Sequence, residues 1–338
     1  MLELTTRQKK ILHSLVQRFI ETATPISSSC LVNNYKLNCS SATVRNELAN
    51  LEAGGYIQQP HTSAGRVPTD KGYRFYVNAL KSWKTITEEE HEQIYGCMEE
   101  AGGNLKVILE EASRILGTIS NELGVVLTPW LTWGIFDRLE LIKLSSCKIL
   151  VVLHVRSRLV KTVILEVKSD LHEKDLEITT SILNERLSGL TLQEIKTTIA
   201  DRMRNVIVGD NVLMRHVIQR ASRLFDFSEP LDVHMAGTQN ILSQPEFSNS
   251  SLFESVIGLI EDKSELIHLF HRKVQKPEIT IGMEHGDTKL QPFTVITAPY
   301  NRGRDVGTLG VIGPTRMHYQ RVLPLVNTMA DMMSQFLS

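Results

Sequence analysis

The sequence predicts a mixed α+β protein in which a small, mainly helical N-terminal unit precedes a larger body of strands and helices. Apolar residues recur at helical spacing through most of residues 1–84, whereas β-rich runs occupy 139–167 and 279–312. The N-terminal unit has 11 Lys and Arg against 5 Asp and Glu, which leaves 26 of the 37 basic and 33 of the 38 acidic residues for 85–338. A basic unit on an acidic body is typical of a DNA-binding head on a regulatory body.

The first two helices are predicted from their caps. Thr5 and Gln8 match a capping box ahead of a helix over residues 7–22, and Pro25 prevents its continuation. Ser27 or Ser28 then caps a short second helix, which a turn at 33–36 follows. The buried stripe of the first helix comprises Ile11, Leu12, Leu15, Val16, Phe19 and Ile20.

A third helix is predicted from Ser40 or Ser41 to the glycine pair Gly54 and Gly55. One face carries Val44, Leu48 and Leu51, and we expect that face to be buried. The other face presents hydroxyl, guanidinium and amide groups, which bond phosphates and base edges. We expect these groups to contact DNA; they are Ser41, Thr43, Arg45, Asn46 and Asn50. On this helix alone, an ordinary solvated face remains the alternative.

A β-hairpin is predicted directly after the third helix, with strands at 56–59 and 67–68 joined by a tight turn at 62–66. Three helices followed by a hairpin indicate a winged helix-turn-helix. Gly65 suits a positive φ at the turn, and Arg66 is expected at the wing tip, against the DNA backbone or in the minor groove.

A fourth helix is predicted over residues 70–80. Its stripe of Tyr73, Tyr76, Val77 and Leu80 is expected in the core, with base stacking as the alternative. Lys71 and Arg74 are expected to stay free for phosphates or solvent, and Lys71 joins the predicted DNA contacts.

The segments SATVRNEL at 41–48, LEAGGYI at 51–57 and PHTSAGRVPTDKGYR at 60–74 resemble the HrcA family of heat-inducible transcription repressors. The resemblance implies a repressor of chaperone operons that binds an inverted-repeat operator in double-stranded DNA. It also implies release on heat stress and a GroE-type chaperonin as a partner that supports activity. Dimer symmetry would match that of the operator, so a homodimer is expected.

The body begins with a helix at Thr87 and a second helix over 105–123, followed by a strand at 124–129. Short connections between the runs at 139–144, 148–155 and 160–167 predict an antiparallel meander.

The later elements of the body are predicted from residue 173 onward. A helical region at 173–227 and a brief strand at 233–235 come first. The remaining expected elements are helices at 251–261 and 264–274, strands at 279–283, 293–298 and 306–312, and a helix at 319–337.

The last strands and the closing helix resemble the end of a GAF-type sensor domain. The resemblance implies a GAF-like α/β domain that an inserted dimerisation domain interrupts. The expected segments are 1–84 for the DNA-binding domain, 85–167 and 250–338 for the two GAF-like parts with a linker helix, and 168–249 for the insert.

The sequence offers little to an enzyme hypothesis, because phosphate-binding glycine loops and a G-x-S-x-G nucleophile motif are absent. The polar clusters at 301–305 and 284–287 are interpreted as solvated turns, and no metal or cofactor is expected. No apolar run is long enough to cross a membrane, and a cytoplasmic protein without a membrane partner is expected.

Two alternatives remain open. In the first, the GAF-like domain binds a small molecule that controls DNA affinity, which is an argument by analogy alone. In the second, an enzyme uses the winged helix only as a docking module.

Overall fold

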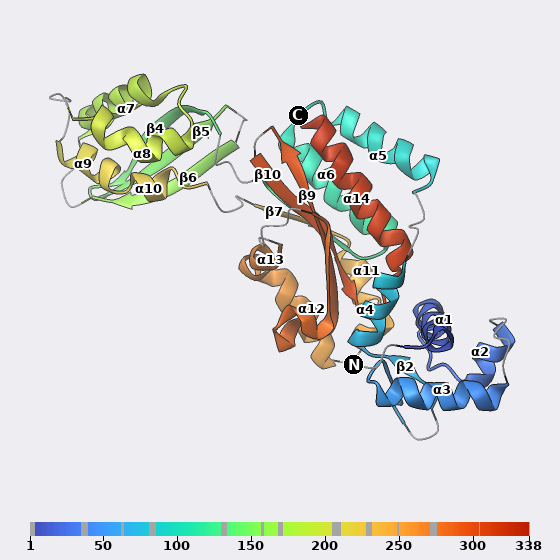
Figure 1. Cartoon of the computed structure of the whole chain (residues 1–338). Helices are drawn as coiled ribbons and strands as arrows, with labels where there is room; N and C mark the ends of the chain where they lie inside the picture. The colour runs from blue at the N-terminus through green and yellow to red at the C-terminus, as the bar shows by residue number, and fades with distance from the viewer. Residues whose placement is uncertain are drawn as a thin grey trace. The chain divides into compact units, whose positions relative to one another are not determined.

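The computed structural model describes residues 4–34, 40–61, 64–80, 86–129, 134–156, 159–167, 172–204, 211–227, 232–248, 250–270, 276–303 and 305–337 (Figure 1). The chain forms two compact units. Unit 1 comprises Met1–Val126, His234–Pro299 and Thr308–Phe336, and unit 2 comprises Leu127–Val233, Tyr300–Gly307 and Leu337–Ser338.

The N-terminal part of unit 1 has the winged-helix arrangement that the sequence predicts. Its elements are α1 (Thr6–Thr22), α2 (Ser28–Asn34), α3 (Ser41–Ala53), β1 (Ile57–Gln58), β2 (Val67–Pro68) and α4 (Asp70–Ala79). The strands β1 and β2 pair antiparallel. The turn expected at 33–36 is wrong at its start, because Asn33 and Asn34 complete α2; residues 35 and 36 lie outside the described residues.

Capping and burial explain these helices. Thr5 forms the predicted capping box with Gln8, and Ala23 ends α1 in the left-handed conformation, at φ 53°. Ser40 caps α3, whose Val44, Leu48 and Leu51 are buried as expected.

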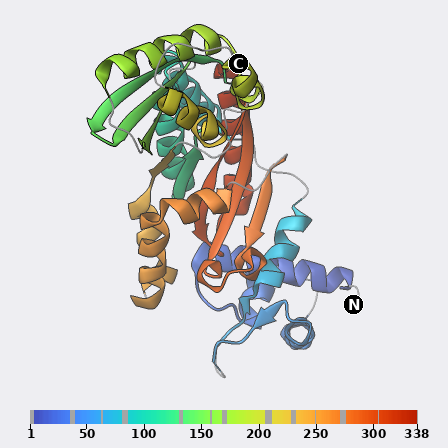
Figure 2. The same ribbon diagram turned by 90° about the vertical axis from the view of Figure 1, so that its left-hand side faces the viewer.

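A five-stranded sheet forms the centre of unit 1, in the strand order β7-β3-β10-β9-β8. Its strands are β3 (Leu123–Leu127), β7 (Val233–Ala236), β8 (Glu278–Ile281), β9 (Phe293–Arg302) and β10 (Asp305–Pro314), of which β3, β7, β9 and β10 reach into unit 2. The helices beside it are α5 (Glu88–Glu100), α6 (Leu105–Ser120) and α14 (Tyr319–Phe336). Figure 2 shows α6 and α14 running together along one side of the strands, where they pack against each other.

Two local expectations for unit 1 differ from the structure. The second helix of the body ends at Ser120 and not at residue 123, because Asn121 adopts a left-handed φ of 59° and Leu123 already belongs to β3. The sequence analysis also missed short helices between residues 238 and 248. This region contains α11 (Thr238–Leu242) and η1 (Pro245–Ser248). The expected helices α12 (Ser250–Glu261) and α13 (Lys263–Phe270) follow. Two short helical turns, η2 (Gly282–His285) and η3 (Thr288–Leu290), lie between β8 and β9.

Unit 2 contains the predicted antiparallel meander as a separate three-stranded sheet. The strands β4 (Phe136–Ser145), β5 (Lys148–Val155) and β6 (Leu159–Glu166) pair in chain order. One sheet face shares a core with α7 (Glu173–Leu187), α8 (Leu192–Arg202), α9 (Asn211–Gln219) and α10 (Ala221–Leu224). The Asn184 side chain joins α7 to β4, because it accepts a bond from the Leu139 amide (2.7 Å) and donates one to the Leu139 carbonyl (2.9 Å).

The two ends of the long segment of unit 2, Leu127–Val233, meet each other. Thr128 and Asp232 bond to each other through three hydrogen bonds of 2.8 to 3.2 Å, so the two ends of the intervening segment lie side by side. The meander therefore groups with α7 to α10, whereas the expected segment 85–167 grouped it with the linker helix. Among the helices that the structure describes, none has the length and apolar character needed to cross a membrane.

Glu122 is a buried carboxyl group beside the central sheet. It is 4% exposed, and a side chain at Gly313 would collide with its Oε2. Burial raises the pKa of Glu122 well above its ordinary value, a shift that Arg316 opposes and Glu246 reinforces. The folded chain therefore binds this proton more tightly than the unfolded chain does.

We predict that Glu122→Gln makes the protein less sensitive to rising pH. In the parent protein, stability is fully present below the ordinary pKa of Glu122 and is lost as the pH rises toward the raised value, because unfolding releases the proton. Glutamine has the shape of the neutral acid and does not ionise. Thermal unfolding from pH 4 to pH 8, with the exposed Glu177→Gln as control, measures the difference; parallel pH profiles for Glu122→Gln and parent would contradict the prediction.

Candidate DNA interface and its attachment to the body

The exposed face of α3 is the candidate recognition surface. Arg45, Asn46 and Asn50 all lie exposed on this helix. Within the part of the chain that the structure describes, Arg45 has no ion-pair partner, and Asn50 makes only a long contact of 3.5 Å to Glu47. These side chains can therefore bond to a groove without first losing an internal partner.

Ser41 and Thr43 occupy a different environment at the start of α3. Both are half-buried: Ser41 Oγ lies 3.3 Å from Ser28 Oγ, and Thr43 Oγ1 lies 3.0 Å from Ser40 Oγ. The Thr43 amide also donates to Ser40 Oγ at 3.1 Å. These contacts cap the start of α3 and join it to the start of α2, so these two residues have a structural role whether or not they reach DNA.

Glu47 fixes α3 against α1, a role that the sequence analysis missed. Its carboxylate accepts a 3.0 Å bond from Gln8 Nε2 and lies 3.7 Å from the Arg7 guanidinium. The contact holds the back of the recognition helix in place. A pattern of helical spacing cannot reveal it, because the partners are 39 residues apart.

Arg66 lies at the base of the wing and not at its tip, in contrast to the expectation. Its backbone pairs with Ile26, and its guanidinium forms an ion pair with Glu52 at 3.0 Å. Gly65 does not adopt the expected positive φ; a glycine is required here because an added Cβ would lie 2.5 Å from the Ile26 backbone. Residues 62 and 63 of the expected turn lie outside the described residues.

Lys71 is not free, as the sequence analysis expected. Its ammonium donates to the Gly54 carbonyl at 2.7 Å and lies 4.1 Å from the centre of the Tyr56 ring. The Thr69 hydroxyl donates to the Gly55 carbonyl at 2.7 Å. Both residues satisfy carbonyls just past the end of α3 and so tie α4 to the recognition helix.

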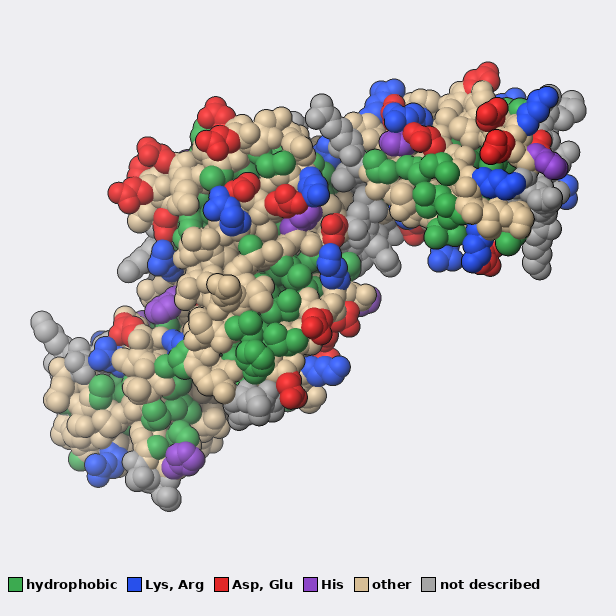
Figure 3. All heavy atoms as spheres, turned by 180° about the vertical axis from the view of Figure 1, so that it is seen from behind, with side chains coloured by type: hydrophobic (Ala, Val, Ile, Leu, Met, Phe, Trp, Pro, Cys, Tyr) green, Lys and Arg blue, Asp and Glu red, His purple; other side chains and the backbone are tan. Residues whose placement is uncertain are grey.

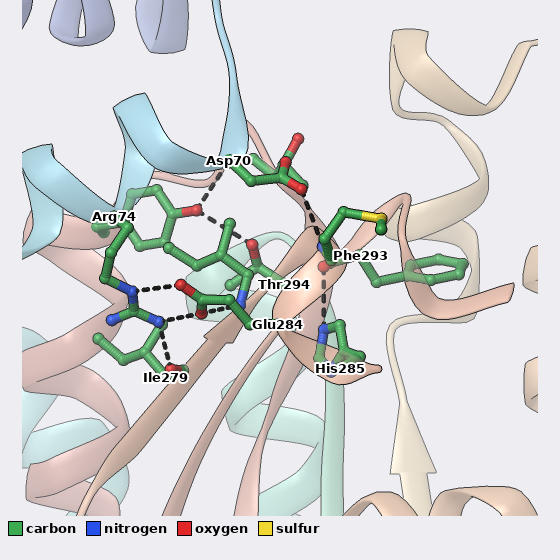
Figure 4. A network of polar contacts seen from close by, with 11 residues as sticks. Asp70, Arg74, Ile279, Glu284, His285, Phe293 and Thr294 are labelled. Carbon is green, nitrogen blue, oxygen red and sulfur yellow. Dashed lines mark hydrogen bonds and ion pairs between the residues drawn. The ribbon is translucent and has the colours of Figure 1, made fainter. Parts of the chain in front are cut away.

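Arg74 is also not free, because it joins α4 to the body (Figure 4). Its guanidinium donates to both carboxylate oxygens of Glu284 and, at 2.6 Å, to the Ile279 carbonyl. One turn earlier, the Asp70 carboxylate accepts a 2.9 Å bond from the Met283 amide. Burial raises the pKa of Glu284, but bonds from Arg74 and the Ile281 amide outweigh burial, so the net shift is downward.

Two further contacts complete this attachment. Tyr73 and Tyr76 of α4 are buried, and their rings lie 6.3 and 6.5 Å from the ring of Tyr319 in α14. Arg316 donates to the Ile20 carbonyl at the end of α1 (2.8 Å) and pairs with Glu246. We call these contacts, together with those of Asp70 and Arg74, the α4 joint. Tyr73, Tyr76 and Val77 of the predicted stripe are thus core, whereas Leu80 follows the end of α4 and is only half-buried.

A cleft of about 400 Å³ lies beside the α4 joint, lined by residues of α1, α4, α5, α6 and α14. Among the lining side chains that the structure describes, Glu90 pairs with Arg321 and Glu21 with Arg18. Their charges already have partners, so these contacts do not call for a charged ligand. A sensor role for the body therefore stays a prediction.

A basic three-helix unit with a wing and an exposed polar helix face, attached to a larger body, defines a transcription regulator of the winged-helix class. Residues 106–323 match the family model of the HrcA protein C-terminal domain. The chain is 39% identical to the heat-inducible transcription repressor HrcA of Chlorobium phaeobacteroides, with 99% of each chain covered. It is 40% identical to that of Prosthecochloris aestuarii, over 98% of this chain and 97% of the other. The chain belongs to the HrcA family of heat-inducible transcription repressors, which is not a family of enzymes.

A solved structure has the same overall fold. The crystal structure of a hypothetical protein aligns with a TM-score of 0.61 over 99% of each chain, at 24% sequence identity.

We predict that Lys71→Met destabilises the winged helix, whereas Arg45→Ala leaves its stability unchanged. Losing the bond to Gly54 and the contact with the Tyr56 ring costs about 1 kcal/mol of unfolding free energy. Truncation of an exposed residue stays within about 0.5 kcal/mol. Chemical denaturation of both variants measures the difference; equal stability would contradict the internal role of Lys71.

Proposed function

We propose that this chain represses heat-shock genes by binding an inverted-repeat operator as a dimer in the cytoplasm, one winged helix to each half-site. The observation that carries the proposal is the uncovered polar face of α3, with Arg45, Asn46 and Asn50 exposed. An Arg side chain suits guanine and an Asn side chain suits adenine in the major groove. Ser41, Thr43, Arg66 and Lys71 are proposed as lesser contacts, to the DNA backbone.

The outer face of the meander supports the dimer. The strand register sets Ile142, Leu150 and Ile164 side by side across the three strands. Ile142 is 44% exposed and Ile164 is 60% exposed, and both are on the face opposite the core of unit 2. Seen from behind, unit 2 presents a group of hydrophobic side chains (Figure 3). An inverted repeat requires two copies of the chain related by symmetry. We therefore propose that a second copy covers this apolar face.

The body is proposed to be a GAF-like domain interrupted by an inserted dimerisation domain. In the sequence, β3 precedes the long segment of unit 2 and β7 follows it. The two strands are neighbours in the central sheet, and the ends of the segment meet at Thr128 and Asp232. Such adjacent ends are what an insertion into an existing domain requires.

Release on heat stress and support by a GroE-type chaperonin complete the proposal. The support for both comes from family membership, since the relatives are named heat-inducible transcription repressors. A divided domain with a long insert is also a chain that folds slowly, which favours assistance by a chaperonin.

We predict that Arg45→Ala weakens operator binding and reduces base preference. If Arg45 bonds a base, the loss is about 1–3 kcal/mol on the operator and much smaller on random DNA. Fluorescence anisotropy on both duplexes measures this, with Lys106→Ala on α6 as a control of equal charge change. Equal losses on both duplexes would instead assign Arg45 to a phosphate.

We predict that Ile164→Lys converts the dimer to a monomer. A buried, unpaired ammonium at the centre of the interface raises the dissociation constant by more than about tenfold. Glu177→Lys, on the exposed side of α7, introduces the same residue and is expected to leave the dimer intact. Sedimentation analysis compares them; a dimeric Ile164→Lys protein would exclude this face as the interface.

A further inference from the structure

We propose that the α4 joint fixes the direction of the recognition helix relative to the rest of unit 1 and thereby determines which half-site spacing the dimer accepts. Asp70, Arg74 and Glu284 then act as positioning residues for operator choice, although none of them belongs to the recognition face. This inference rests on the proposed dimeric function, because spacing has meaning only for two linked heads.

The contacts of α4 with the body are directional. Asp70 and Arg74 are four residues apart and so lie on one side of the helix. Asp70 binds a backbone amide, and Arg74 binds both oxygens of one carboxylate together with a carbonyl. Such paired, charge-assisted bonds are lost when the helix rotates by a few tens of degrees.

The backbone of the body is shaped to receive Asp70. Gly282 has a φ of +55°, and an added Cβ would lie 2.1 Å from the Asp70 carboxylate. Glycine adopts this φ without strain and has no Cβ to occupy the space. The Met283 amide therefore lies against Asp70 without a side chain between them. The close fit indicates one defined seating of α4.

A second point of attachment prevents the winged helix from pivoting about α4. Arg316 binds the last turn of α1 through the Ile20 carbonyl, and its side chain is only 11% exposed. Between the two attachments, Tyr319 packs against Tyr73 and Tyr76. Two polar attachments around an aromatic centre hold the winged helix against the rest of unit 1.

The position of α4 also fixes the position of the end of α3. Lys71 and Thr69 bond the carbonyls that follow α3, at Gly54 and Gly55. At Gly72 an added Cβ would lie 2.2 Å from the Tyr56 carbonyl, so α4 crosses directly over the chain that leaves the recognition helix. Because Arg45, Asn46 and Asn50 remain exposed in this state, the joint directs the recognition face and does not cover it.

The test measures spacing preference. The operator is the duplex that the parent protein selects from a random library. Binding is measured on this duplex, on versions with about five base pairs, half a helical turn, added or removed between the half-sites, and on a half-site. The variants are Arg74→Met in the winged helix, Glu284→Gln in the body and their combination, with Lys106→Met as control.

For the parent and the control, changing the spacing is expected to reduce affinity by more than about tenfold, because only one head can then bind. For the joint variants the same change is expected to cost less than about threefold, with unaltered half-site affinity, since a loosely held head reaches more positions. The combined variant should match Arg74→Met, because Glu284→Gln acts on a contact that Arg74→Met has already removed.

Joint variants that keep the spacing preference of the parent would overturn the inference, as would a loss of half-site binding, which would indicate damage to the winged helix itself. Failure of the proposed function has a different signature. In that case the parent protein itself binds the full duplex no more tightly than the half-site.

Discussion

The contact between Arg74 and Glu284 joins residues 210 positions apart and connects the DNA-binding head to the body. It lies on α4, which bonds the chain just past the recognition helix through Lys71 and the sheet of unit 1 through Arg74. The hydrogen bonds described above connect the body to the winged helix through α4 and through Arg316 at the end of α1. Small changes there are therefore expected to have large effects on operator choice.

Unit 2 depends on a different constraint: its sheet has two faces, and its own helices cover only one of them. One face of the meander is covered by α7 to α10 and forms a core with Phe136 and Phe225, whose rings pack edge to face. The other face carries Ile142 and Ile164 into solvent. Exposed apolar residues gathered on one sheet face are typical of an interaction surface, and a second copy of the chain is the partner that we propose for it.

Local patterns predicted the helices well because caps and apolar stripes are properties of short segments. Thr5, Ser40 and Thr69 all cap the helices that were expected to follow them. The meander was also predicted, since its connections are short. Its separation from the central sheet was not, because alternation within a strand does not say which sheet the strand joins.

The corrections in the candidate site share one cause. Arg66 was expected at the wing tip, and Lys71 and Arg74 were expected to stay free for phosphates or solvent, because a cation in a basic unit suggests a phosphate. The structure gives each an internal partner, at Glu52, Gly54 and Glu284. Glu284 itself was interpreted as part of a solvated turn. Charge pattern alone cannot separate these roles, since partners distant in sequence become neighbours only on folding.

The most direct test of a dimeric operator reader is a titration at fixed salt against three duplexes: the inverted repeat of the family, a single half-site and a scrambled sequence. Tight binding to the full repeat, with a large loss on the half-site and a larger one on the scrambled duplex, is the predicted result. Equal affinity for all three duplexes, from protein that remains folded and is retested with chaperonin and ATP, would contradict it.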